Sequence, residues 1–165
     1  MSKPPDSADD LAVIAWAEQR CRLLYDGVDV AHRSCGIALA ETFGKKTAPY
    51  QALRRGGLTG HGTCGAIQAG LLVLGEVFGD PDPTAPATDD LRRAAARYRQ
   101  LWRDIESLTG QESVVCNDLT GRFPIFKGPQ RHAFCTDLAA QVARCVAQTI
   151  TELGGTVDAL PPPKS

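Results

Sequence analysis

The spacing of its apolar residues is the feature that most constrains how this chain can fold. From Asp10 to Tyr25, apolar side chains recur at steps of three and four residues after an acidic start, a pattern typical of an amphipathic helix. Few segments show the strict apolar–polar alternation of a half-buried strand. The same criterion predicts further helical segments over 29–43, 49–55, 66–78, 88–108, 116–119 and 132–153. The sequence therefore predicts an all-α fold, a compact bundle of about five helices, in which 49–55 and 116–119 are short.

Glycine and proline residues mark where the helices should end. Gly44, Gly79, Gly110 and Gly154 each follow an expected helix, as glycines at helix C-termini do. Residues 80–87 hold three prolines and cannot continue either neighbouring helix, so we expect a surface loop there. A length of 165 residues fits one domain over 1–165. We expect an ordered core at about 10–155 and flexible tails at 1–9 and 156–165.

The composition excludes several classes of protein. The formal net charge is −1, with charges of both signs scattered along the chain, which argues against a nucleic-acid-binding protein and against one bound to a membrane surface. The N-terminus is polar and acidic, unlike a signal peptide, and we find no membrane span. We therefore expect a cytoplasmic protein. In that reducing compartment, its six cysteines are expected to be thiols, metal ligands or catalytic groups rather than disulfides.

All three histidines of the chain stand three residues before a cysteine. The pairs are His32 with Cys35, His61 with Cys64, and His132 with Cys135. Residues three apart on a helix project from one face, so each pair could offer an imidazole nitrogen and a thiolate to one centre. The repeated spacing predicts a metal-binding or thiol-redox protein.

The cysteines also follow a known pattern. Cys35, the turn Cys64-Gly65-Ala66 leading to Gly70, Cys116 and Cys135 resemble the C, GCAxxG, C, C pattern of a family of redox-active proteins, and the similarity extends over roughly 34–146. In this chain Gly65 follows the cysteine instead of preceding it, and one extra residue separates Ala66 from Gly70. The split-Soret cytochromes contain a related domain and add covalent haem. This chain has no Cys-x-x-Cys-His segment and its one methionine is Met1, which excludes a covalently attached c-type haem.

The resemblance implies that Cys35, Cys64, Cys116 and Cys135 are the functional thiols. Ligation of an iron–sulfur cluster is a use that suits four thiolates, because soft, anionic sulfur matches iron. Four cysteines and three histidines exceed the ligands of one tetrahedral site. Either the centre is dinuclear, or the cysteines are the ligands and the histidines lie outside them.

Cys64 is expected to be the most reactive of these thiols. The glycine-rich loop at 56–65 leads into a predicted helix, so Cys64 lies near a helix N-terminus, and both this position and His61 would favour a thiolate. Cys21 and Cys145 are expected to behave as small apolar core residues.

Three functions are open on this basis. The first is a cytoplasmic redox protein whose four cysteines bind an iron–sulfur cluster for electron transfer or redox sensing, with an electron-transfer protein as its partner. The second is a metal-free thiol oxidoreductase in which Cys64 attacks and Cys35, Cys116 or Cys135 resolves. The third is a structural or storage protein that binds zinc. The sequence leaves open whether the chain is an enzyme and whether it forms a homodimer that shares ligands.

Overall fold

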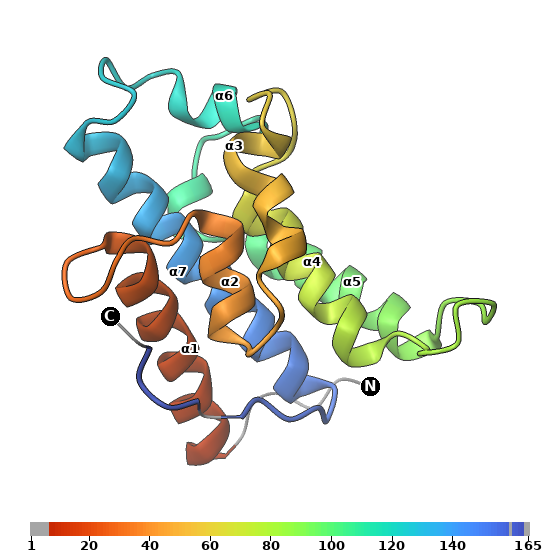
Figure 1. Cartoon of the computed structure of the whole chain (residues 1–165). Helices are drawn as coiled ribbons and strands as arrows, with labels where there is room; N and C mark the ends of the chain where they lie inside the picture. Colours follow the sequence, from red (N-terminus) through yellow and green to blue (C-terminus); the bar gives the residue numbers. More distant parts are fainter. Residues whose placement is uncertain (1–6, 159, 164–165) are drawn as a thin grey trace.

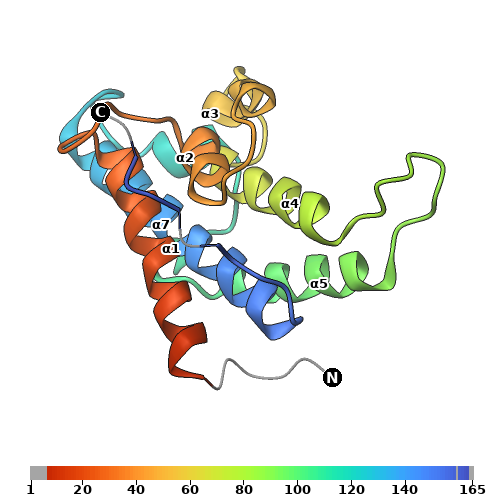
Figure 2. The same cartoon turned by 60° about the horizontal axis from the view of Figure 1, so that its bottom comes forward.

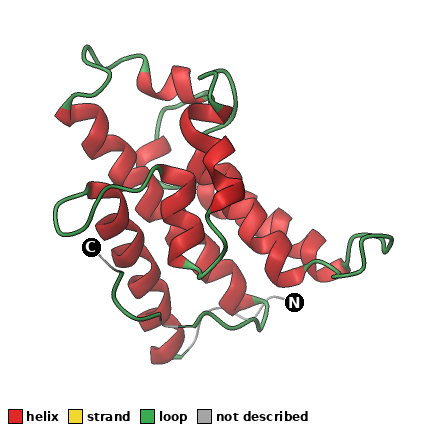
Figure 3. Cartoon of the chain, in the orientation of Figure 1, coloured by secondary structure: helices red, strands yellow, loops and turns green. Residues whose placement is uncertain are grey.

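The regular structure of this chain is helical. A computed structural model describes residues 7–158 and 160–163, and this part contains no strand, which confirms the all-α fold (Figure 3). The α-helices of eight or more residues are α1 (Ala8–Asp26), α2 (Cys35–Thr42), α4 (Gly65–Phe78), α5 (Asp89–Arg103) and α7 (Pro129–Glu152). The shorter ones are α3 (Arg54–Gly57) and α6 (Cys116–Thr120), and 3-10 turns lie at Ala48–Leu53 and Glu106–Leu108. The described part therefore has seven α-helices where about five were predicted, because two single turns form in the segments that connect the longer helices.

Helix α2 is shorter than the sequence predicted. It begins at Cys35 and not at residue 29. Gly27 ends α1 in the left-handed conformation, with a φ of 74°, which glycine adopts without steric cost. The backbone N–H of Arg33 then donates to the carbonyl of Leu24 (2.8 Å). The chain thus turns back over the end of α1 before α2 can start.

The three His-x-x-Cys pairs consequently have different local structures. His32 lies in the connection between α1 and α2, and His61 lies in the loop before α4. Only His132 lies on the same helix as its cysteine, within α7. The expectation that each pair projects from one helical face is therefore wrong for the first two pairs.

The core forms between α7 and the helices that pack around it. Helix α7 runs through the middle of the molecule, with α1 along one side and α2 and α4 along another (Figures 1 and 2). Helix α5 packs beside α4, where the buried Tyr98 hydroxyl donates to the Ile67 carbonyl (2.8 Å). This arrangement brings the first residues of α2, α4 and α6 close to the first half of α7. The buried α7 residues include Leu138, Val142, Val146 and Ile150, which recur every four positions.

Two of the six cysteines belong to this core, as the sequence predicted. Cys21 has an exposed fraction of 0% and Cys145 one of 3%. The Cys21 thiol donates to the carbonyl of Ala139 on α7 (3.5 Å). Both residues serve as small packing side chains.

The ends of the chain were predicted to be tails at 1–9 and 156–165. Residues 1–6, 159 and 164–165 lie outside the described residues. In the described part, the Ser7 hydroxyl accepts a hydrogen bond from the backbone N–H of Asp10 (3.0 Å) and caps α1. Val157 packs against the core, and the carbonyl of Pro161 accepts a hydrogen bond from Arg20 (2.7 Å). Part of the C-terminal segment is therefore packed on the helices.

The two longest helices, α1 and α7, both carry charged residues along their length. Glu18 and Arg22 are examples in α1. None of the described helices combines the length and the apolar character needed to cross a membrane.

Candidate functional site

Four cysteines from four helices reach one small cavity. Cys35 is the first residue of α2, Cys64 is the N-cap of α4, Cys116 is the first residue of α6, and Cys135 lies in the second turn of α7. They line a cavity of about 40 Å³, which we call the cysteine cavity. Its other walls are mainly apolar, and its charged lining residues are two arginines, Arg55 and Arg131. The structure thus brings together the four cysteines that the resemblance implied.

The glycine-rich loop fixes Cys64 beside Cys116. The backbone N–H of Cys64 donates to the carbonyl of Val114 (2.7 Å), and that of Cys116 donates to the carbonyl of Gly62 (3.0 Å). An isolated antiparallel bridge joins Thr63 to Val115 between them. These hydrogen bonds hold the entrance of α4 and the entrance of α6 at a fixed separation, so both thiols approach the cavity from a rigid backbone.

Two glycines in this region permit very close packing. A Cβ on Gly56, whose φ is 57°, would lie 2.6 Å from the carbonyl oxygen of Gly62 and 2.8 Å from the Cβ of Cys116. A Cβ on Gly65 would lie 2.8 Å from the Sγ of Cys35. Such distances are well inside van der Waals contact, so only glycine lets the loop and the start of α4 pack this tightly against the cysteines.

Two opposing effects act on the buried thiols. Helix N-termini carry a partial positive charge that favours thiolates, and for Cys64 the backbone N–H groups of Ile67 and Ala66 lower the pKa. Burial acts in the other direction and is the larger effect. It raises the pKa of Cys35 to about 12 and also raises the pKa of Cys64, where the neighbouring Cys35 adds to the rise. In the metal-free protein both side chains are therefore neutral thiols at pH 7.

The expectation that His61 activates Cys64 is wrong. His61 is exposed and is not among the residues that line the cysteine cavity. Backbone hydrogen bonds to Val114, Cys116 and Asn117 shape the loop that carries His61, and Cys64 is buried while His61 stays at the surface. The expected thiolate character of Cys64 is overcome by burial.

The other two histidines meet at one edge of the cavity, beside Tyr25. The ring centroids of His32 and His132 lie 4.7 Å and 5.4 Å from that of Tyr25, and 5.5 Å from each other. Nδ1 of His32 hydrogen-bonds to the carbonyl of Tyr25, and Nε2 of His132 to the carbonyl of Asp26 (2.8 Å). Because a carbonyl only accepts, these nitrogens carry the protons, and the opposite ring nitrogens are the unprotonated ones in the neutral histidines.

Tyr25 connects the two histidines to the thiols. It lines the cysteine cavity, and its hydroxyl hydrogen-bonds to Cys135. Burial raises the pKa of Cys135, whereas the charge of Arg131 and the hydrogen bond from Tyr25 lower it. More neighbouring groups therefore favour a thiolate at Cys135 than at Cys35 or Cys64.

Tyr25 and Arg131 are lining residues that the sequence did not single out. Arg131 precedes Cys135 by four residues on α7, so helical spacing could have indicated that they share a face. Arg55 lines the cavity from the segment just before the glycine-rich loop. Its backbone is left-handed, with a φ of 49° and a ψ of 54°, and this conformation turns the chain into the glycine-rich loop.

Within the described residues, no group of three or more histidine, cysteine or acidic side chains is close enough to hold a single metal ion. All six cysteines are free. Four thiols line the cavity, and no carboxylate of the described residues does, which suits a group that prefers soft ligands.

Comparison with known proteins supports the pattern of cysteines. A family model described as "Putative redox-active protein (C_GCAxxG_C_C)" matches residues 33–149, which is more than half of the chain. No curated protein and no solved structure matches this sequence.

Proposed function

Because the chain belongs to the C_GCAxxG_C_C family of redox-active proteins, we propose that it is a redox protein in which Cys35, Cys64, Cys116 and Cys135 hold an iron–sulfur cluster. The observation that carries the proposal is the convergence of these four cysteines on the cysteine cavity. When bound, a cluster would supply one-electron transfer. Electron transfer to a protein partner, or redox sensing, is the role we propose for it.

The surroundings of the cavity are suited to a thiolate-ligated cluster. Iron–sulfur clusters bind to cysteine thiolates and usually carry net negative charge. Three of the four cysteines stand at helix N-termini, and Arg55 and Arg131 line the cavity. Partial and full positive charges therefore surround the position where the negative charge would lie.

Four thiolates could hold either an iron–sulfur cluster or a single zinc ion. The described residues show no preassembled group for a metal ion of either kind. A cluster fits a redox-active family better, because zinc supplies no redox chemistry. Binding of a cluster would require the four thiols to lose their protons, so we expect cluster assembly to be favoured as the pH rises.

Thiol chemistry is the second candidate function. It is supported by the contact between Tyr25 and Cys135 and by the electrostatic coupling of Cys135 with Cys35. In a metal-free protein Cys135 would be the attacking thiolate, in place of Cys64. It would displace one sulfur from a partner disulfide to form a mixed disulfide, and Cys35 would then displace the second sulfur, leaving a Cys35–Cys135 disulfide and the partner as a dithiol.

The test is metal and sulfide analysis, with an absorption spectrum, on protein purified without oxygen. We expect iron and sulfide with a broad visible band in the unmodified protein. Cys35→Ser, Cys64→Ser, Cys116→Ser and Cys135→Ser should each lose the band, because each removes one ligand. Cys145→Ser is the matched control, since Cys145 is equally buried and lies on α7 outside the cavity.

Each result separates the candidates. Retention of the full iron content in all four variants would refute the cluster proposal. Colourless protein with stoichiometric zinc would indicate the zinc site instead. Metal-free protein that reversibly loses two thiols upon treatment with peroxide, but not after Cys135→Ser, would indicate thiol chemistry.

A further inference from the structure

A second, larger cavity opens directly beside the cysteine cavity. It has a volume of about 390 Å³, and we call it the basic vestibule. It shares Tyr25, Cys35, Arg55 and Arg131 with the cysteine cavity. A molecule in the vestibule would therefore lie next to Cys35, the half-buried cysteine that lines both spaces.

The vestibule is positively charged and has no acidic lining residue. Its cationic side chains are Arg54, Arg55, Lys127 and Arg131. Arg54 donates to the neutral side chain of Gln51 (2.7 Å), and Arg55 and Arg131 lie over the ring of Phe126, at 4.8 Å and 4.0 Å from its centroid. Within the described residues, none of these four cations forms an ion pair. Their charge is left for a ligand to neutralise.

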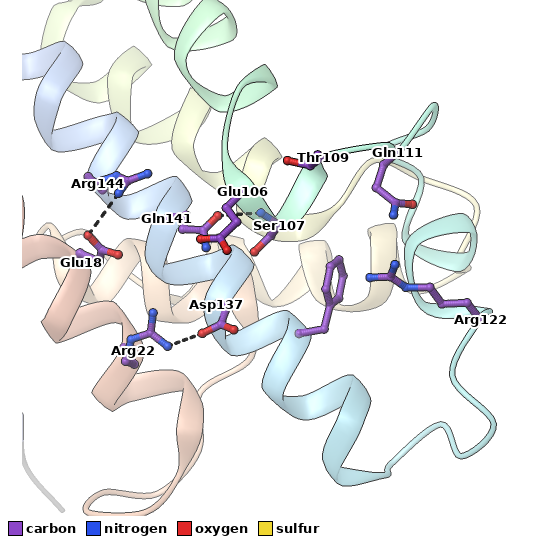
Figure 4. Close-up of a pocket in the computed structure, with 11 residues that line it drawn as sticks. Glu18, Arg22, Glu106, Ser107, Thr109, Gln111, Arg122, Asp137, Gln141 and Arg144 are labelled. Carbon is purple, nitrogen blue, oxygen red and sulfur yellow. Dashed lines mark hydrogen bonds and ion pairs between the residues drawn. The ribbon is translucent and has the colours of Figure 1, made fainter.

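A groove elsewhere on the molecule differs from the vestibule, because acidic residues line it as well as arginines. It is lined by residues of α1, α7 and the segment 106–111, and it contains both arginines and acids (Figure 4). There Arg22 pairs with Asp137, and Arg144 lies 3.8 Å from Glu18, as the dashed lines in Figure 4 mark. Two of its three arginines thus pair with acids of the protein, whereas none of the four cations of the vestibule does so within the described residues.

The vestibule also contains buried donors without acceptors. Nε of Arg131 and Oγ of Ser34 are both buried, and neither has a hydrogen-bond partner in the described part of the chain. Buried polar atoms are almost always hydrogen-bonded, so two residues that line the vestibule each keep one polar atom without a partner among the described residues. Ser34 is the N-cap of α2 and Gly128 that of α7, and both line the vestibule. The backbone N–H groups of two helix starts add to the attraction for an anion.

We propose that the basic vestibule binds a small organic molecule through a carboxylate or phosphate group and holds it beside Cys35. The four cationic side chains, which form no ion pair in the described part of the chain, account for the anionic group. The volume of about 390 Å³ lies within the range of pockets for small organic ligands, roughly 300–1,000 Å³, and exceeds what a bare ion fills. The aromatic rings of Tyr25 and Phe126 offer apolar surface to the remainder of the molecule.

The test is calorimetric titration with phenyl phosphate, benzoate and inorganic phosphate at low ionic strength. We expect saturable binding of one phenyl phosphate per chain, tighter than that of inorganic phosphate because only the former contacts the aromatic rings. Arg131→Gln should weaken binding about tenfold or more by removing a charged donor. Arg55→Gln should act in the same direction, and because Arg55 is exposed, this second variant keeps the test valid if Arg131→Gln fails to fold.

Arg99→Gln is the matched control, because Arg99 is an exposed arginine on α5 away from the vestibule. We expect it to bind phenyl phosphate as the unmodified protein does. Equal weakening in Arg99→Gln, or binding that does not saturate, would overturn the proposal. Equal affinity for phenyl phosphate and inorganic phosphate would overturn the assignment to an organic ligand. Anion binding does not require the proposed cluster, so iron content and affinity are independent readouts, and failure of one proposal leaves the other standing.

Discussion

Replacing Gly65 with alanine tests how closely helix α4 packs against Cys35. The new Cβ would lie 2.8 Å from the Sγ of Cys35 and even closer to the carbonyl oxygen of Leu53. A side chain could move aside, but the Leu53 oxygen belongs to the backbone and can shift only with its segment. Forcing an extra methyl group into a packed core costs about 1–3 kcal/mol, whereas alanine gains about 1 kcal/mol over glycine in a helix. We therefore expect Gly65→Ala to lower the free energy of unfolding by up to about 2 kcal/mol.

Gly75→Ala is the matched control on the same helix. A Cβ on Gly75 meets no heavy atom within 4 Å, so only the gain in helix propensity applies, and stability should rise by up to about 1 kcal/mol. Because the helix gain is common to both variants, they should differ by the packing cost of about 1–3 kcal/mol in urea unfolding, or by roughly 2–12 °C in Tm for a chain of this size. Equal stability of the two variants would refute the close packing of Gly65. Gly65→Ala should also lower the iron content, because it displaces Cys35, whereas Gly75→Ala should leave the iron content unchanged.

Two further predictions concern titration and packing. Burial raises the pKa of Cys21, Cys35 and Cys145 from an ordinary value of 9.0 to about 12, so above pH 9 the unfolded chain releases protons that the folded metal-free protein retains. Its free energy of unfolding should therefore be unaffected by these thiols below pH 9 and should fall as the pH rises from 9 toward 12. The midpoint of urea unfolding, measured between pH 7 and pH 10.5, tests this decrease. A midpoint that rises with pH would contradict the prediction. Glu152→Gln should lower the free energy of unfolding by about 1–3 kcal/mol, because Glu152 is 6% exposed and pairs with Arg97 at 2.6 Å. This variant should leave iron content and phenyl phosphate binding unchanged, since the pair lies in neither cavity.

Helices with a continuous apolar stripe were predictable from the sequence. Helices α1, α4, α5 and α7 follow the expected segments, because each buries one face and ends near a glycine or an irregular segment. The start of α2 was not predictable in this way. It depends on the hydrogen bond from the backbone N–H of Arg33 to the carbonyl of Leu24. This contact joins two segments, and the sequence of each segment by itself is compatible with a helix.

The candidate site was predictable only in part. The family pattern identified the four cysteines, and their convergence on one cavity agrees with it. Apolar periodicity contains no information on loops, so nothing indicated that 60–62 would pair with 116–117 or that Phe126 would lie beneath Arg55. The basic vestibule is built from such contacts. Arg131 lies more than seventy positions after Arg54 and Arg55 in the sequence, and only the folded chain brings them together.

The electrostatics of the cysteine cavity connect the proposed cluster to the raised pKa values. Thiolates in this small cavity would lack the hydration that normally compensates their charge, and burial accordingly raises the pKa of Cys35, Cys64 and Cys135. Metal cations would compensate the sulfur charge instead, and the helix N-termini with Arg55 and Arg131 could then balance the smaller negative charge that remains. On this reasoning the metal-free thiols should react slowly with iodoacetamide at pH 7, and faster as the pH rises. Rapid alkylation of Cys64 at pH 7 would show that the helix N-terminus outweighs burial, and it would favour thiol chemistry over the cluster.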